Sequence, residues 1–184
     1  GRWLERGWRH VGGRWRLREL VMRLLRHLFA RSSRRLFPED SLHRITEAIA
    51  AGERLHRGEV MFAVETNLPP GAVLAGMQAR ERAHEVFVRL RTWDTEANNG
   101  VLIYLLLADH RIEIVADRGL DGRVSDAQWA QVCRLIEQEM RAGHPERAVI
   151  DGVRAVSDLL ALHWPQQEGQ SDEDELPNRP ALLD

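Results

Sequence analysis

Acidic and amide side chains gather around two neighbouring apolar runs of this sequence. Asn98 and Asn99 come just before the run 101–108, whereas Asp117 ends the run 111–117 and Asp121 follows it. Carboxylate and amide oxygens are hard ligands, of the kind that calcium and magnesium prefer in proteins. The residue types therefore indicate a divalent-cation site, Ca²⁺ or Mg²⁺, with these candidate ligands: Asp94, Asn98, Asn99, Asp117 and Asp121.

The segment 117–128 matches part of a helix-loop-helix calcium motif. Asp117 and Asp121 fall at loop positions 1 and 5. However, Gly119 stands at position 3, and Gln128 stands at position 12, where the motif needs a bidentate glutamate. A strand pattern also precedes the segment where the motif has a helix. We therefore exclude an EF-hand.

A second interpretation of the same residues needs no ligand. Asn98-Asn99-Gly100 is typical of a turn, and Gly119 and Gly122 also suit turns. Ser125 or Asp126 fits a helix N-cap. The two interpretations are not exclusive, so both stay open.

Other catalytic chemistries find little support in the composition. All 26 basic residues are arginine, which excludes Schiff bases and phosphate-loop lysines. No serine lies in a nucleophile elbow, and no glycine-rich nucleotide loop is present. The single cysteine, Cys133, lies in a helical pattern and is expected to be a buried, inert thiol. The catalytic residues of any activity are thus unknown from the residues alone.

Three strand patterns and the helices between them would position the candidate ligands. The strands are predicted at 59–66, 101–108 and 111–117, with a loop at 67–73. The run 101–108 is apolar on both faces, which is typical of a central strand. Helical patterns cover the segments 37–58, 75–93, 125–143 and 145–164.

The order of these elements predicts an α/β fold. A strand-helix-strand unit makes the first two strands parallel, and the short link 109–110 makes the third strand antiparallel, as a β-hairpin. Helices can then cover both faces of a small mixed sheet, as a three-layer α/β/α sandwich. In this topology the loops 94–100 and 117–125 share one edge of the sheet, with Glu59 on the same side.

Charge divides the chain into three parts. Residues 1–35 hold eleven arginines and two glutamates, a net charge of +9. Residues 36–164 have a net charge of −6, and residues 165–184 have a net charge of −5. We therefore predict a basic arm at 1–37, a folded domain at 38–164 and a disordered acidic tail at 165–184.

The basic arm has the pattern of an amphipathic helix. An apolar stripe repeats at helical spacing through these residues: Leu17, Leu20, Val21, Leu24, Leu25 and Leu28. Such a helix can pack on the domain, pair with a protein partner or a second copy, or lie on an anionic membrane surface. Nothing in it resembles a nucleic-acid-binding motif, so no nucleic acid is expected.

Several strings resemble the TPM domain family, in the order expected for it. They are "HRGEVMFAVE", "WDTEANNGVLIYLLLADHRIEIVADRGLDG" and "VIDGVRAVSDLLALHWP", and together they resemble its short bacterial branch. The resemblance covers residues 38–164 and implies a Rossmann-like α/β/α sandwich. Plant members are described as acid phosphatases, and some members bind calcium through acidic loops. By position, Asp94, Asp117 and Asp121 would lie at the acidic-loop site, and Asn99 and Gly100 at the start of the central strand.

We expect a non-catalytic TPM-domain binding module in the cytoplasm, peripheral to the inner membrane or to a partner. Its site would hold a divalent cation. The alternative is a weak metal-assisted phosphatase, in which Asp117 and Asp121 hold the metal and Arg118 stabilises phosphate charge. In a third, structural hypothesis, the arm is an oligomerisation helix.

Overall fold

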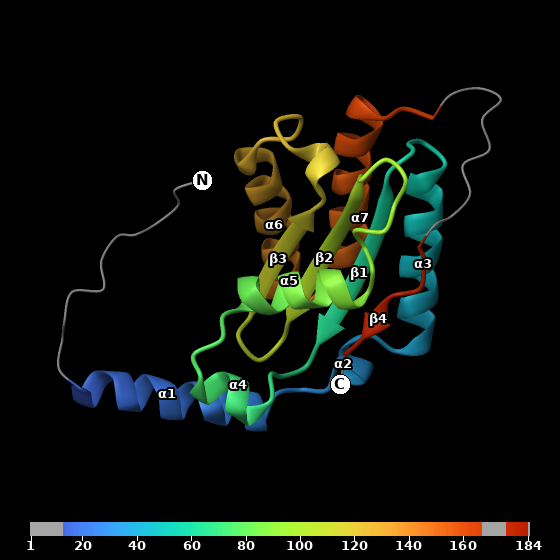
Figure 1. The fold of residues 1–184 in the computed structure, drawn as a ribbon. Coiled ribbons are helices and arrows are strands. Elements are labelled where there is room, and N and C mark those ends of the chain that lie inside the picture. The colour runs from blue at the N-terminus through green and yellow to red at the C-terminus, as the bar shows by residue number, and fades with distance from the viewer. Residues whose placement is uncertain (1–12, 167–175, 184) are drawn as a thin grey trace.

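The computed structural model describes residues 13–166 and 176–183, which form a mixed four-stranded sheet with helices packed around it (Figure 1). The strands are β1 (Glu59–Glu65), β2 (Gly100–Leu106), β3 (Arg111–Ala116) and β4 (Ala181–Leu182). The helices are α1 (Gly13–Leu28), α2 (Ser33–Leu36), α3 (Glu39–Glu53), α4 (Pro70–Leu74), α5 (Ala79–Arg89), α6 (Asp126–Arg141) and α7 (Pro145–His163), with one 3₁₀ turn, η1 (Arg118–Leu120).

The sheet has the strand order β3-β2-β1-β4. Strands β1 and β2 are parallel, and β2 and β3 form an antiparallel hairpin. Every residue of β2 is buried, as expected for a strand that pairs on both sides and packs on both faces. The predicted α/β class, the mixed sheet and the hairpin are therefore confirmed.

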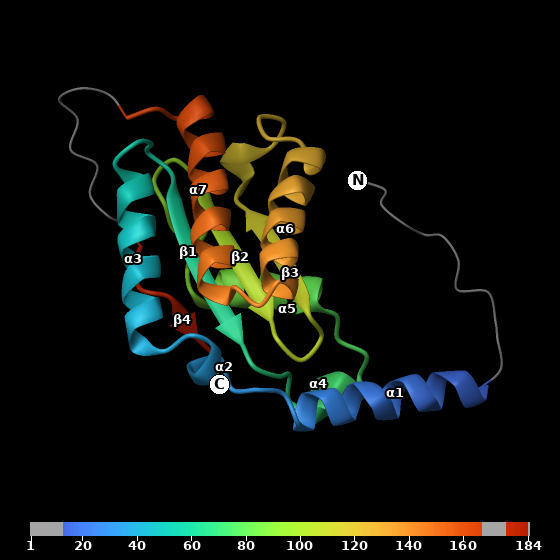
Figure 2. The ribbon, with the colours of Figure 1, turned by 180° about the vertical axis from the view of Figure 1, so that it is seen from behind.

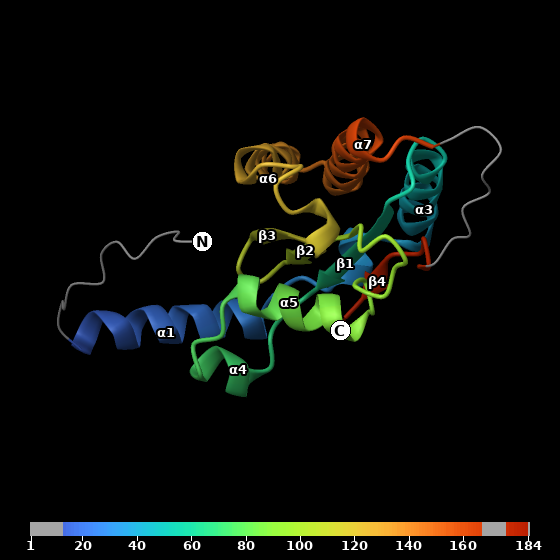
Figure 3. The same cartoon turned by 45° about the horizontal axis from the view of Figure 1, so that its top comes forward.

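Helices lie on both faces of the sheet, which Figure 3 shows nearly edge-on. Helices α3, α6 and α7 cover one face (Figure 2), and α5 crosses the other. Alternating side chains of the strands enter the two cores, Ile103 on the side of α3 and α7 and Leu102 on the side of α5. This alternation explains why the strands read as continuous apolar runs in the sequence.

Two local predictions need correction. The predicted loop 67–73 contains the short helix α4, which begins at Pro70 because proline suits the first turn of a helix. The helix predicted at 75–93 is shorter, since α5 covers only Ala79–Arg89. After α5 the chain turns through Arg91, whose φ of 57° lies in the left-handed region.

The prediction of a disordered tail is wrong for residues 176–183. Strand β4 pairs in parallel with β1, and Leu183 N–H donates to the carbonyl oxygen of Val64 at 2.9 Å. Leu176 is buried among the side chains on the α5 face. The end of the chain therefore belongs to the domain, whereas residues 167–175 lie outside the described residues.

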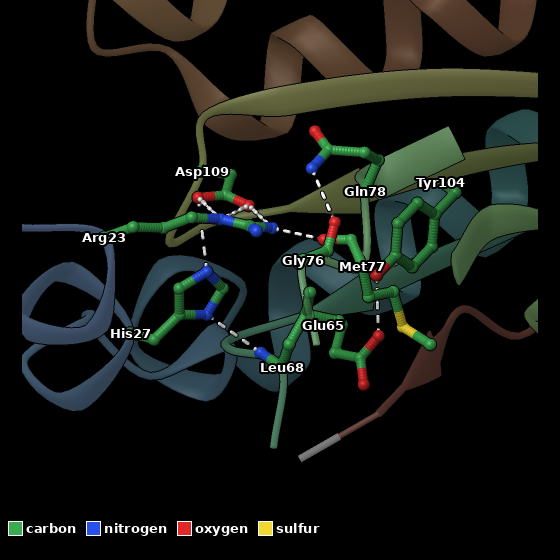
Figure 4. A network of polar contacts seen from close by, with 9 residues as sticks. All are labelled: Arg23, His27, Glu65, Leu68, Gly76, Met77, Gln78, Tyr104 and Asp109. Atoms are coloured by element: carbon green, nitrogen blue, oxygen red, sulfur yellow. Dashed lines mark hydrogen bonds and ion pairs between the residues drawn. The ribbon is translucent and has the colours of Figure 1, made fainter. Parts of the chain in front are cut away.

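The arm forms the predicted helix, α1, and docks across the end of the sheet where β1 and β2 finish (Figure 1). Figure 4 shows the polar contacts that hold it. Arg23 Nη2 lies 2.7 Å from Asp109 Oδ2 and 2.6 Å from the carbonyl oxygen of Met77. His27 is buried, and its Nδ1 accepts a hydrogen bond of 2.9 Å from Leu68 N–H. Residues 1–12 of the predicted arm lie outside the described residues.

Charge and burial act together at this contact. Burial alone would raise the pKa of Asp109, but Arg23 and His27 together hold it below its usual value. Burial lowers the pKa of His27 by more than the neighbouring Asp109 raises it. Since Nδ1 of His27 accepts a hydrogen bond from Leu68 N–H, the neutral ring carries its own proton on Nε2, which faces Asp109 at 3.2 Å.

A second buried ionic group lies on the α5 face, at the end of β1. Arg82 donates two hydrogen bonds to the Glu65 carboxylate, at 2.9 and 2.8 Å, and Tyr104 O–H donates a third at 2.6 Å. Burial raises the pKa of Tyr104, and the bond to Glu65 raises it further. The carboxylate is thus compensated by donors from α5 and β2.

In the part of the chain that the structure describes, no helix has the length and apolarity that a membrane span requires.

Candidate functional site

The candidate site lies at the edge of the sheet where β1 and β2 begin and β3 ends. Glu59 pairs with Gly100, the first residue of β2. On the other side of Gly100, its carbonyl oxygen accepts a hydrogen bond of 2.9 Å from Asp117 N–H. The predicted meeting of the loops before β2 and after β3 is therefore present.

Asn98 binds the loop after β3 directly. Its carbonyl oxygen accepts a 2.8 Å hydrogen bond from Gly119 N–H, and its side-chain Oδ1 accepts one of 2.9 Å from Arg118 Nε. Asn98 has a φ of 51°, which asparagine tolerates better than most residues. A Cβ on residue 119 would lie 2.4 Å from the Asn98 carbonyl oxygen, so this approach requires glycine.

Asn99 is held from the β1 side. Its side-chain amide donates to the carbonyl oxygen of Arg57 at 2.6 Å, and its N–H donates to Thr95 Oγ1 at 3.1 Å. Asn99 is only 1% exposed. Its Oδ1 is buried and has no hydrogen-bond partner among the described residues.

Asp117 and Glu59 flank Gly100 on the same face of the sheet, because residues opposite one another on adjacent strands point the same way. Asp117 caps η1, since its Oδ1 accepts a 2.7 Å hydrogen bond from Arg118 N–H. Its second oxygen, Oδ2, is buried without a hydrogen-bond partner within residues 13–166 and 176–183. Glu59 is 5% exposed.

Thr92, just after α5, completes this arrangement. Its carbonyl oxygen lies 1.9 Å from the position that a Cβ of residue 100 would occupy, so glycine at 100 lets the two backbones touch. The Thr92 side chain is fully buried, and its Oγ1 has no hydrogen-bond partner in the described part of the chain. Sequence reasoning missed Thr92, and a glycine opening a buried strand was the one local signal of such a close approach.

The remaining predicted ligands lie differently. Asp94 forms an exposed ion pair with Arg91, three residues before it. Asp121 is exposed at the C-terminal end of η1. Across the described ranges, no group of three or more His, Cys, Asp or Glu side chains is placed to hold a metal ion. Any cation bound here would need amide, hydroxyl or carbonyl oxygens in addition to carboxylates. That the five candidate residues bind a cation stays a prediction.

His56 lies buried behind the site, next to the Arg57 carbonyl that holds Asn99. Its Nδ1 accepts a 3.2 Å hydrogen bond from Gly58 N–H, and it is 1% exposed. Burial lowers the pKa of His56 to about 4, so the ring is neutral near pH 7. On α6, burial raises the pKa of the Cys133 thiol to about 11, which makes it a poor nucleophile.

Comparisons with known proteins give a consistent picture. The family model described as TPM domain matches residues 32–159. Among solved structures, the chain is similar to the NMR structure of the BA42 protein from the psychrophilic bacterium Bizionia argentinensis, with 28% identity and a TM-score of 0.69. That match covers 78% of this chain and 93% of the other. Among curated proteins, none matches this chain.

Proposed function

Because this chain belongs to the TPM domain family, we propose that it is a non-catalytic binding domain that holds a divalent cation at the edge formed by Asn99, Gly100 and Asp117. The observation that carries this proposal is the set of buried acceptor oxygens without a hydrogen-bond partner in the described residues: Asn99 Oδ1, Asp117 Oδ2 and Thr92 Oγ1. A buried polar atom that lacks a partner costs about 1–3 kcal/mol, so a ligand bound to these oxygens would offset that cost.

The chemistry of these atoms suits a hard cation. Carboxylate, amide, hydroxyl and main-chain carbonyl oxygens are the ligands that calcium takes, and magnesium also prefers oxygen. Glu59 pairs with Gly100 across the sheet, and the Thr92 carbonyl approaches the same glycine. With only two carboxylates the affinity should be modest, because calcium affinity depends on the charge of the ligands. A bound cation would neutralise these carboxylates and tie the loop after β3 to the start of β2.

Calcium and magnesium titrations of the full chain, followed by two-dimensional NMR, test this proposal. We expect saturable shifts confined to residues 57–59, 92–100 and 117–122. Asp117→Asn should move them to at least about 10-fold higher cation concentration, whereas Asp158→Asn, which alters an exposed carboxylate on α7, should leave them unchanged. Shifts that are absent or spread evenly over the surface carboxylates would overturn the cation site.

One observation favours the phosphatase alternative as a second candidate. Arg118 adjoins Asp117, and its guanidinium lies against Asn98 through the Nε bond. A phosphoester at a cation held by Asp117 would therefore meet a guanidinium, which suits phosphate charge. Hydrolysis of p-nitrophenyl phosphate with calcium, magnesium or manganese tests this candidate, and Arg118→Gln should then lower kcat. A chain that binds the cation but hydrolyses nothing leaves the binding domain as the function.

The proposal also includes the detailed architecture of the fold and the location of the protein in the cell. The fold is taken as a Rossmann-like three-layer sandwich, which α5 on one face and α3, α6 and α7 on the other support (Figure 3). The location is taken as the cytoplasm, with peripheral attachment through α1. Attachment through α1 agrees with the large apolar side chains that this helix leaves exposed.

A further inference from the structure

Helix α1 presents two different apolar faces. Leu20 and Leu24 face the domain and pack on the core that contains α4 and α5, next to the contacts of Arg23 and His27. Part of the stripe predicted from the sequence is thereby used for docking. The other face is exposed.

The exposed face carries a regular stripe. Its residues follow one another at helical spacing of four, four and three, with exposed fractions of 63%, 45%, 41% and 63%: Leu17, Val21, Leu25 and Leu28. At a rise of about 1.5 Å per residue the stripe is about 16 Å long. Met22 and Phe29 extend it, and Phe29 is 80% exposed. An apolar surface of this kind marks a binding face.

A groove continues this surface toward the body of the domain. It has a volume of about 880 Å³ and lies between α1, the β2–β3 turn and the junction of α6 and α7. Leu25, Met22 and Phe29 form one wall, and Met140 and Pro145 belong to the opposite side. The exposed apolar surface is thus a ridge with a hollow beside it.

The charge around this surface is positive. Arg26, Arg31 and Arg35 line the groove together with His110, and none of the described carboxylates lines it. Arg18 and Arg34 are also exposed on the same segment. Residues 17–36 hold six arginines against one glutamate, whereas residues 36–164 have a net charge of −6. The chain therefore concentrates positive charge where it exposes apolar side chains.

We propose that this end of the molecule, the α1 stripe with the groove, docks on an anionic lipid bilayer. An apolar ridge flanked by arginines matches an interfacial helix, which lies in the plane of the bilayer with its apolar side among the acyl chains and its arginines at the headgroups. The groove arginines bind lipid phosphates, and the hollow accepts acyl-chain segments. A second copy fits this face less well, because pairing two such ends would bring like charges together.

The contacts behind α1 make this docking rigid. Arg23 and His27 fix the helix to Asp109 and to the chain after β1, so the helix is already folded and oriented before it meets lipid. Preorganisation of this kind lowers the entropic cost of association. Bilayer docking does not depend on the cation site, which lies at the opposite end of β1 and β2.

Flotation of the full chain with vesicles tests the proposal. We expect binding to equimolar phosphatidylglycerol and phosphatidylcholine, and little to phosphatidylcholine alone. The double variant Val21→Glu/Leu25→Glu should lower the partition coefficient by at least about 100-fold, because each buried apolar side chain contributes about 10-fold or more. Arg26→Gln/Arg35→Gln should lower it by about 30-fold, since each arginine near an anionic surface contributes about fivefold.

Matched controls carry the same changes elsewhere. Val88→Glu/Leu162→Glu alters two exposed apolar residues of the same types on α5 and α7, and Arg89→Gln/Arg134→Gln removes two exposed arginines from α5 and α6. Both should bind within about twofold of the unaltered chain, because their side chains lie outside the docking surface. Circular dichroism checks that every variant is folded.

Three results would overturn the proposal. Equal binding to the neutral and the anionic vesicles would remove the role of the arginines. Full binding by Val21→Glu/Leu25→Glu would place the lipid contact elsewhere. A dimer in sedimentation velocity that this variant disperses, without any vesicle binding by the unaltered chain, would assign the face to a second copy.

Discussion

Arg23 and Asp109 are separated by 86 positions in the sequence, yet Nη2 and Oδ2 lie 2.7 Å apart, and the Nε of the same arginine reaches the carboxylate at 3.1 Å (Figure 4). The pair joins α1 to the turn between β2 and β3. The two side chains are 15% and 9% exposed, so they are much less accessible to solvent than those of the ion pairs on the surface of this protein. Attachment of the arm thus rests on a specific contact as well as on apolar packing.

Arg23→Met should detach α1 and destabilise the fold by about 2–3 kcal/mol, because it leaves a partly buried carboxylate without its main partner. Urea unfolding measures the loss, and hydrogen exchange should show earlier opening of residues 17–28. Arg141→Met is the control, because its pair with Glu137 is exposed, and it should cost less than about 0.5 kcal/mol. Equal effects of the two variants would contradict a structural role for the buried pair.

The candidate cation ligands should separate into strong and weak positions. Asp117→Asn should weaken calcium binding at least about 10-fold, because Asp117 Oδ2 is buried beside the start of β2. Asp121→Asn and Asp94→Asn should change it less than about threefold, since Asp121 is exposed and Asp94 is paired with Arg91. Isothermal titration with each variant checks the order. A larger loss with Asp121→Asn would restore the ligand set predicted from the acidic loop.

His56 should make the protein sensitive to acid. Its folded pKa of about 4 lies below the model-compound value of 6.5, so the unfolded chain binds the proton more readily between these values. Stability is therefore fully present above about pH 6.5 and falls as the pH drops toward 4, by about 3 kcal/mol for this residue.

Urea midpoints at several pH values measure the effect of His56. The His56→Gln variant should lose stability overall but should lack this share of the pH dependence. Above pH 7 the difference between the two proteins should be constant, which serves as the internal control. An unchanged slope between pH 6.5 and 4 in the variant would show that other groups cause the acid sensitivity.

The contact between Thr92 and Gly100 should tolerate no side chain. Gly100→Ala would place a Cβ 1.9 Å from a main-chain oxygen, so one strand end must move, at a cost of about 3 kcal/mol. Gly71→Ala is the matched control, because nothing lies within 4 Å of its added Cβ and the site is helical. This control should stabilise slightly, by about 0.5 kcal/mol. Thermal unfolding of the two variants distinguishes them.

The buried triad under α5 should be more sensitive than any surface pair. Arg82→Met leaves Glu65 with Tyr104 as its remaining donor from this group, and should cost about 3–5 kcal/mol. Tyr104→Phe keeps the bidentate arginine and should cost about 1–2 kcal/mol. Chemical denaturation gives both values. The reverse order would mean that the tyrosine hydroxyl, and not the arginine, compensates the carboxylate.

Elements with a strong local pattern could be predicted from the sequence. The three long strands are largely apolar runs, and the short link between the last two fixes their directions. These directions alone bring the chain before β2 beside the chain after β3, as the Asn98–Gly119 hydrogen bond shows. Local pattern and chain direction are enough for the architecture and for the general place of the site.

The missed features depend on distant partners. Strand β4 is only Ala181–Leu182 in a proline-containing tail, and it is a strand because β1 offers its edge. The burial of Thr92 follows from a backbone approach that no periodicity records. The use of Leu20 and Leu24 for docking, with Leu25 left outside, depends on where α1 crosses the sheet. Sequence patterns identify an apolar stripe but do not divide it between two neighbours.

The parallel pairing of β1 and β2 also limits how the two ends of the molecule can influence one another. Strands of seven residues hold the ends about 20 Å apart. This distance is more than two Debye lengths, each about 8 Å at physiological ionic strength. The electrostatic effect of a charge bound at one end is therefore largely screened by the solvent at the other end. Coupling between the two ends would require a conformational shift of the central strands. Without such a shift, binding at one end does not affect binding at the other.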